Sequence, residues 1–154
     1  MRTRNADVSF SLVVPLALVV FVLLRGDPIY LGLWYYLTVP AVVVAVLYAL
    51  TSPAFFVPGA TFGLSATFLV YWFVQFQRAQ PEGLLGLGHL FSVPGALLGL
   101  LIARYAVRAF PGIGPVWSFV LALVGSGLGF AAAQGVVCNT AMWCGDILSF
   151  MPVR

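Results

Sequence analysis

Five long apolar segments, separated by short breaks, constrain this chain more than any other feature. They cover residues 8–24, 29–50, 54–76, 84–103 and 113–133. Each has roughly the 17 to 25 residues that a helix needs to cross a hydrocarbon core about 30 Å thick. Every Asp, Glu and Arg lies outside these segments. The pattern predicts an all-α, polytopic transmembrane helix bundle with about five spans.

The composition supports a single integral membrane domain over residues 1–154. Hydrophobic residues make up 62% of the chain and charged residues only 7%, whereas soluble domains carry about 25% charged residues. The net charge of +3 comes from scattered arginines, which form no basic patch that would indicate nucleic-acid binding. Because all basic residues are Arg and the chain is rich in Ala, Gly, Val and Leu, we expect a bacterial protein of the cytoplasmic (inner) membrane.

The arginines also predict an orientation. Cytoplasmic loops carry an excess of basic residues, and the pairs Arg2/Arg4 and Arg104/Arg108 fall on one face of a five-span bundle. This favours a cytoplasmic N-terminus and an outer C-terminus, with residues 145–152 along the outer interface. Arg104 and Arg108 are expected to face anionic lipid of the inner leaflet.

Aromatic residues gather where lipid headgroups meet acyl chains, and their positions agree with five spans. The short stretch 51–57 is the weakest boundary, because it must turn the chain between two spans. The residues expected near the outer interface are Tyr30, Trp34, Tyr35, Tyr36, Tyr71, Trp72 and Trp143, and those near the inner one are Tyr48, Tyr105 and Trp117.

Small residues predict where the helices touch. Membrane helices approach closely where Gly, Ala, Ser or Thr recur every four residues. Three consecutive segments carry such stripes, and these favour internal packing, with oligomer or partner contacts as the alternative. The stripes are Gly59, Gly63 and Thr67; Gly95 and Gly99; and Gly125, Gly129 and Ala133.

Polar residues at similar depth predict a cluster in the outer leaflet. It consists of Gln75, His89, Ser92 and Gln134. Polar groups in lipid need partners, so we expect hydrogen bonds between helices. The alternative is the mouth of a small oligomeric carrier or channel.

The two cysteines, Cys138 and Cys144, follow the fifth segment and would lie on the outer, oxidising side. A structural disulfide is the preferred interpretation, and a redox-active pair or free thiols are the alternatives. A metal site formed by His89 and both cysteines, with Asp146 or Glu82, is weaker, because no two of these residues have a recognised ligand spacing. No catalytic residue, metal or cofactor is therefore assigned.

The sequence favours a non-enzymatic protein that acts by helix–helix recognition in the bilayer. It could be an accessory subunit of a membrane complex or an immunity-type protein against a membrane-active toxin; a homo-oligomer is also open. A carrier or channel and a membrane thiol or redox protein are the alternatives. Proton-coupled transport is disfavoured because the predicted spans lack the carboxylate, Lys or Arg that such transporters use.

Overall fold

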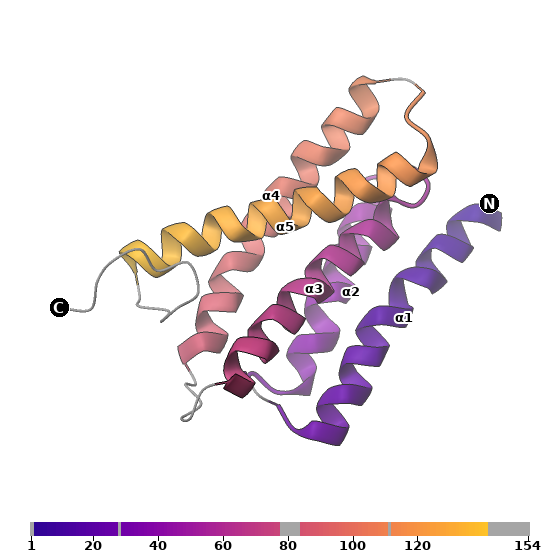
Figure 1. Ribbon diagram of the computed structural model, residues 1–154. Coiled ribbons are helices and arrows are strands. Elements are labelled where there is room, and N and C mark those ends of the chain that lie inside the picture. Colours follow the sequence, from indigo (N-terminus) through magenta and orange to yellow (C-terminus); the bar gives the residue numbers. More distant parts are fainter. Residues whose placement is uncertain (1, 28, 78–83, 111, 142–154) are drawn as a thin grey trace.

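The computed structural model describes residues 2–27, 29–77, 84–110 and 112–141. This part of the chain forms five α-helices (Figure 1). They are α1 (Arg2–Arg25), α2 (Leu33–Ala49), α3 (Phe56–Gln77), α4 (Leu84–Ala109) and α5 (Pro115–Thr140). The all-helical prediction is confirmed. Four of the helices are long and apolar enough to cross a membrane, and α2 is a shorter apolar helix.

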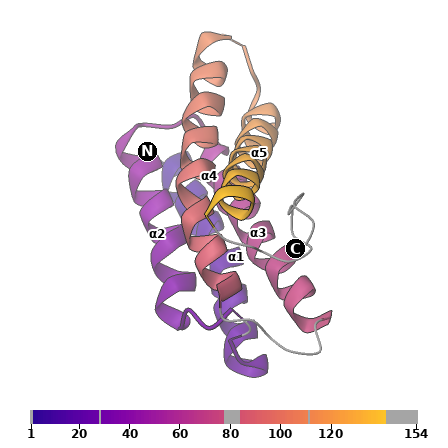
Figure 2. The same ribbon diagram turned by 90° about the vertical axis from the view of Figure 1, so that its left-hand side faces the viewer.

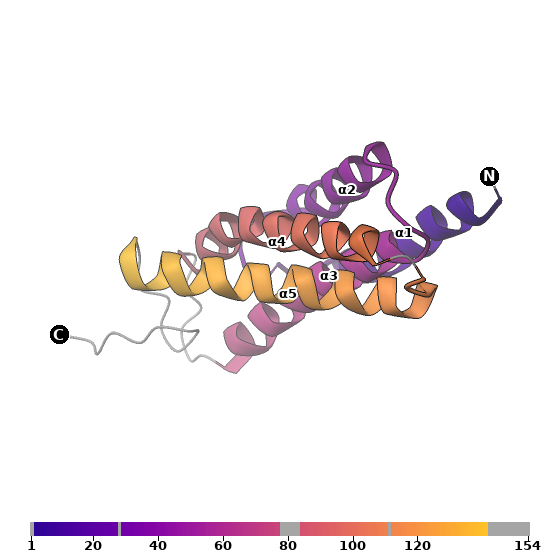
Figure 3. The same ribbon diagram turned by 90° about the horizontal axis from the view of Figure 1, so that it is seen from above.

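Successive helices run in alternating directions, and α5 crosses the others obliquely (Figure 1). Seen from the side and from above, α4 and α5 form one pair beside the group of α1, α2 and α3 (Figures 2 and 3). The contact between α4 and α5 is the most extensive, followed by that between α3 and α5. About two thirds of the most apolar part of α3 is buried (67%), against 22–39% in the other three long helices. The central helix is therefore α3.

Glycines allow α5 to approach both of its neighbours. A Cβ atom at Gly95 would lie 2.5 Å from the carbonyl oxygen of Gly129, and one at Gly125 would lie 2.8 Å from that of Gly99. On the other side of α5, a Cβ at Gly63 would lie 2.8 Å from the Leu123 carbonyl oxygen. A Cβ at Gly59 of α3 would come closer still to the backbone of α5, at the Phe119 carbonyl oxygen. The stripes thus lie where α4 and α3 meet α5.

Charged side chains hold the turn between α2 and α3. Arg104 donates a hydrogen bond to the Leu50 carbonyl, and Arg108 donates to the Leu50 carbonyl and to both oxygens of Thr51, at 3.2 Å each. At the start of α3, the Asp7 carboxylate accepts a hydrogen bond from the Phe55 N–H at 3.0 Å. Cations stabilise helix C-termini and anions stabilise N-termini. The arginine pair, expected to face lipid, is engaged with the end of α2.

The helix boundaries differ from the predicted spans most clearly before α2. Residues 29–32 form a loop there, although the apolar run begins at Ile29. The carboxylate of Asp27 accepts hydrogen bonds from the Ile29 N–H at 3.2 Å and the Gly32 N–H at 2.5 Å, which hold the backbone out of the helix. Two later helices are longer than predicted: α4 continues to Ala109 and α5 to Thr140.

Candidate functional site

His89 lies at the centre of the bundle and is fully buried. Aromatic rings from three neighbouring helices surround its imidazole. Phe68 stacks on it with a centroid distance of 4.3 Å, and Tyr71 and Phe130 contact it at 4.9 and 4.8 Å. Tyr35 of α2 contacts its edge at 5.7 Å. The histidine therefore ties α4 to α2, α3 and α5.

Both ring nitrogens of His89 are hydrogen-bonded, and the bonds fix the tautomer. The Thr67 hydroxyl donates its only proton to the Leu64 carbonyl at 2.6 Å. It must therefore act as acceptor towards Nε2 of His89, 2.9 Å away, so that Nε2 carries the proton. The Tyr35 hydroxyl then donates to Nδ1 at 2.8 Å. A charge on this fully buried ring would be costly, so the imidazole is neutral, and it has no free nitrogen for a substrate or a metal ion.

A second set of bonds joins α4 to α5 near the same level. The Ser92 hydroxyl shares its proton between the Gly88 carbonyl at 2.7 Å and the side-chain oxygen of Gln134 at 2.5 Å. The amide nitrogen of Gln134 donates to the sulfur of Cys138 at 2.7 Å, one turn farther along α5. Ser92, Gln134 and Cys138 are all buried. Three members of the predicted cluster, His89, Ser92 and Gln134, thus form interhelical hydrogen bonds.

The fourth predicted member, Gln75, is buried on α3, one turn beyond Tyr71. No free cysteine is present among the described residues. Cys144 lies outside them, so the Cys138–Cys144 disulfide stays a prediction. Asp146, Glu82, Trp143 and the segment 145–152 also lie outside the described residues.

Among the aromatic residues predicted at the depth of the outer interface, several are buried between helices, and their depth in the membrane stays a prediction. Tyr30 and Trp34 are exposed, as headgroup contacts require, but Tyr35, Tyr36 and Trp72 are not. The Tyr36 hydroxyl donates to Asp27 at 2.6 Å and accepts from the indole nitrogen of Trp72 at 3.2 Å.

The sequence did not predict the hydrogen-bond partners of His89 and Tyr36, because most of these contacts join residues far apart in the chain. Tyr35 and His89 are 54 positions apart. One hint of a partner for His89 is present in the sequence: Thr67 belongs to the small-residue stripe of α3 and also carries a hydroxyl.

An apolar groove runs along the outside of the α4–α5 pair. Its volume is about 630 Å³. Gly95, Gly99, Gly125 and Gly129 form part of its lining. The exposed side chains of Leu98, Ile102, Leu128 and Val136 rise beside them.

Comparisons with protein-family models, with curated proteins and with solved structures found no match. The His89 cluster is sealed, neutral and internally bonded, which suits a scaffold that fixes the helices. The described residues contain no group of three or more His, Cys, Asp or Glu placed to hold a metal ion.

Proposed function

We propose that this protein is a non-enzymatic membrane component that acts by helix–helix recognition. It would serve as an accessory subunit of a membrane complex or as an immunity-type protein against a membrane-active toxin. The observation that carries the proposal is the apolar groove along α4 and α5. It presents backbone at four glycines beside exposed Leu, Ile and Val side chains.

The groove suits a partner helix because lipid gives no general reward for burying apolar surface. Association in the bilayer depends instead on close packing, which small residues permit. Leu98 and Leu128 are 62% and 67% exposed and stand beside the glycines, so side chains of a partner helix could insert between them. The sealed His89 cluster behind this surface would keep α4 and α5 in a fixed relation.

The placement in the membrane is part of the proposal. We infer five crossings, with α2 crossing together with the apolar residues Ile29 and Leu31, because its 17 residues alone span only about 25 Å. We further propose a cytoplasmic N-terminus, an outer C-terminus and a location in a bacterial inner membrane. A disulfide between Cys138 and Cys144 would then lie on the outer side.

The carrier or channel has less support. Its proposed mouth includes His89, Ser92 and Gln134, whose polar atoms bond to one another or to neighbouring helices. A water-filled passage would need such groups along an open path. The groove along α4 and α5 has a mainly apolar lining instead.

The test is the recovery of a partner in native lipid. The protein would be extracted in polymer-bounded nanodiscs, and co-purifying membrane proteins would be quantified by mass spectrometry for the wild type and two variants. Ala132→Leu fills the groove from the exposed side of α5. Ala17→Leu makes the same change at an exposed position of α1 outside the groove.

A partner retained by the wild type and Ala17→Leu, but reduced by Ala132→Leu, is the expected result. The absence of any stoichiometric partner would contradict the proposal, as would a partner indifferent to Ala132→Leu. Ion or solute flux through liposomes containing only this protein, lost in His89→Ala, would favour the carrier instead.

A further inference from the structure

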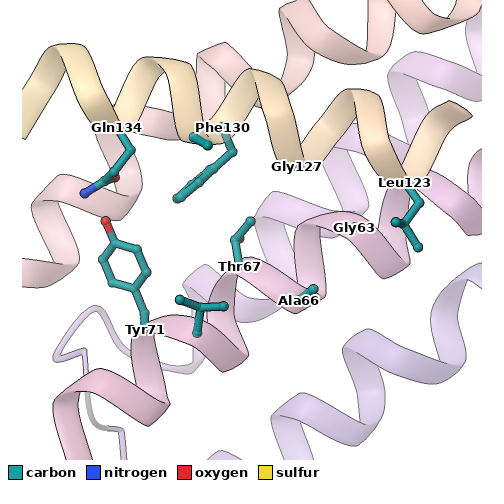
Figure 4. A pocket seen from close by; sticks show the side chains of 10 residues that line it. Gly63, Ala66, Thr67, Tyr71, Leu123, Gly127, Phe130 and Gln134 are labelled. Atoms are coloured by element: carbon teal, nitrogen blue, oxygen red, sulfur yellow. The ribbon is translucent and has the colours of Figure 1, made fainter. Parts of the chain in front are cut away.

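A second groove lies between α3 and α5, on a different side of α5 from the groove proposed for partner recognition. Its volume is about 290 Å³. Figure 4 shows how the two helices form its walls. The lining has no charged residue. Small residues make up much of it, namely Gly63, Ala66, Gly127 and Ala131.

Tyr71 supplies an unpaired polar group to this groove. Its side chain is only 1% exposed, yet its hydroxyl has no hydrogen-bond partner among the described residues. The Gln134 amide nitrogen faces the phenol oxygen (Figure 4) without reaching hydrogen-bond geometry. An amide nitrogen is a donor, so it cannot take the phenol proton. A buried proton donor without an acceptor therefore lies in the wall of the groove.

The other polar groups around Tyr71 already have hydrogen-bond partners. Thr67, which also lines the groove, has its hydroxyl bonded to Leu64 and His89. Gln134 has its oxygen on Ser92 and its nitrogen on Cys138. A buried donor left unpaired destabilises a protein, and in hydrocarbon no bulk water can satisfy it. An acceptor that enters the groove would remove this cost.

We propose that this groove binds one acyl chain of a membrane phospholipid, and that the Tyr71 hydroxyl donates a hydrogen bond to the ester carbonyl oxygen of that chain. The uncharged lining argues for an ester, because a free fatty-acid carboxylate would be buried without a cation. At about 30 Å³ per water-sized group, the groove holds roughly ten methylene-sized groups, enough for part of one chain.

The depth of the site agrees with an ester carbonyl. Tyr71 precedes the end of α3 by six residues, and Gln134 precedes the end of α5 by six. At 1.5 Å per residue, each lies about 9 Å from its helix end. Because α3 and α5 have 22 and 26 residues, they are about 3 to 9 Å longer than the hydrocarbon core. With the excess of α3 shared between its two ends, the Tyr71 backbone lies about 7.5 Å below the headgroup boundary, about one side-chain length from the first carbons of an acyl chain.

The experiment measures lipid retention. The intact protein would be reconstituted in phosphatidylcholine nanodiscs, released into mild detergent and examined by native mass spectrometry. Tyr71→Phe removes only the hydroxyl, and Gly127→Leu fills the groove. Gly135→Leu is the matched control, because Gly127 and Gly135 both have open space where a Cβ would stand, and only Gly127 lines the groove.

We expect retained phospholipid to fall about three- to tenfold in Tyr71→Phe, the effect of one hydrogen bond. It should fall at least as far in Gly127→Leu and stay unchanged in Gly135→Leu. The unfolding midpoint of Tyr71→Phe after removal of lipid should not fall, because an unpaired hydroxyl is lost. Equal retention by all four proteins would overturn the proposal.

A parallel arm adds an isoprenoid benzoquinone, whose carbonyl could use the same donor. Saturable displacement of the phospholipid by the quinone, dependent on Tyr71, would overturn the choice of phospholipid as occupant. No displacement would support it. Neither result bears on the partner recognition proposed for the α4–α5 groove. That proposal is tested by Ala132→Leu, and Ala132 does not line the α3–α5 groove.

Discussion

Replacing Gly125 by alanine should separate α4 from α5. The new Cβ would lie 2.8 Å from the Gly99 carbonyl oxygen and 2.7 Å from the Ala103 Cβ, whereas ordinary contact begins at 3.4 Å. The helices must therefore part locally by about 0.6 Å, because the first of these obstacles is backbone that cannot rotate away. Overpacking of this kind costs about 1–3 kcal/mol. Alanine returns up to about 1 kcal/mol through its helix propensity, so we expect a net loss of up to about 3 kcal/mol.

Gly127→Ala provides the matched control two residues along the same helix. No atom lies within 4 Å of its new Cβ, so it should be neutral or stabilise by up to about 1 kcal/mol. Unfolding would be followed in mixed detergent micelles with increasing dodecyl sulfate, using tryptophan fluorescence, to which the buried Trp72 contributes. Equal stability of the two variants would refute the close backbone approach between α4 and α5.

Other predictions concern the polar contacts. Tyr35→Phe should destabilise by about 1–3 kcal/mol, because it leaves the buried Nδ1 of His89 without a donor; nitrogen NMR should show the Nε2–H tautomer in the wild type, and an Nδ1–H signal would contradict the assignment. Asp27→Ala should cost about 1.5–3 kcal/mol, because two N–H groups and the Tyr36 hydroxyl lose a charged acceptor; an unchanged unfolding midpoint would refute this role. Arg104→Ala should lower the midpoint more than Arg108→Ala, because Arg104 is the less exposed; the reverse order would count against its role at the end of α2. Cys138 and Cys144 should resist maleimide under denaturing conditions until a reductant is added, and immediate labelling would exclude the disulfide.

Local patterns in the sequence predicted the all-helical fold and drew attention to the glycine stripes. Apolar runs of membrane-spanning length mark all five helices, since lipid requires each segment to satisfy its own backbone. Spacing of four residues was enough to select Gly95 and Gly99, which face Gly125 and Gly129 at the α4–α5 approach. The length of an apolar run and the spacing of its small residues are properties of one segment, so they can be read without knowing how the segments pack.

Contacts between distant segments could not be predicted in the same way. The positions of Arg104 and Arg108 suggested lipid headgroups, but their hydrogen bonds go to the end of α2, more than 50 residues away. Tyr35 was predicted at interface depth from its residue type, which carries no sign of its hydrogen bond to His89. Asp27 shortens α2 through side-chain bonds that hydropathy does not register. In each case the partner is set by how the helices pack.

The most direct test of the membrane arrangement concerns α2, which is too short to span a membrane by its own length. Tyr30→Cys and Ala54→Cys place single thiols at exposed positions on either side of it, in a chain whose two native cysteines are replaced by alanine. An impermeant maleimide applied to intact cells should label Tyr30→Cys, and should label Ala54→Cys only after permeabilisation. Labelling of both positions from the same side would contradict the five-crossing bundle.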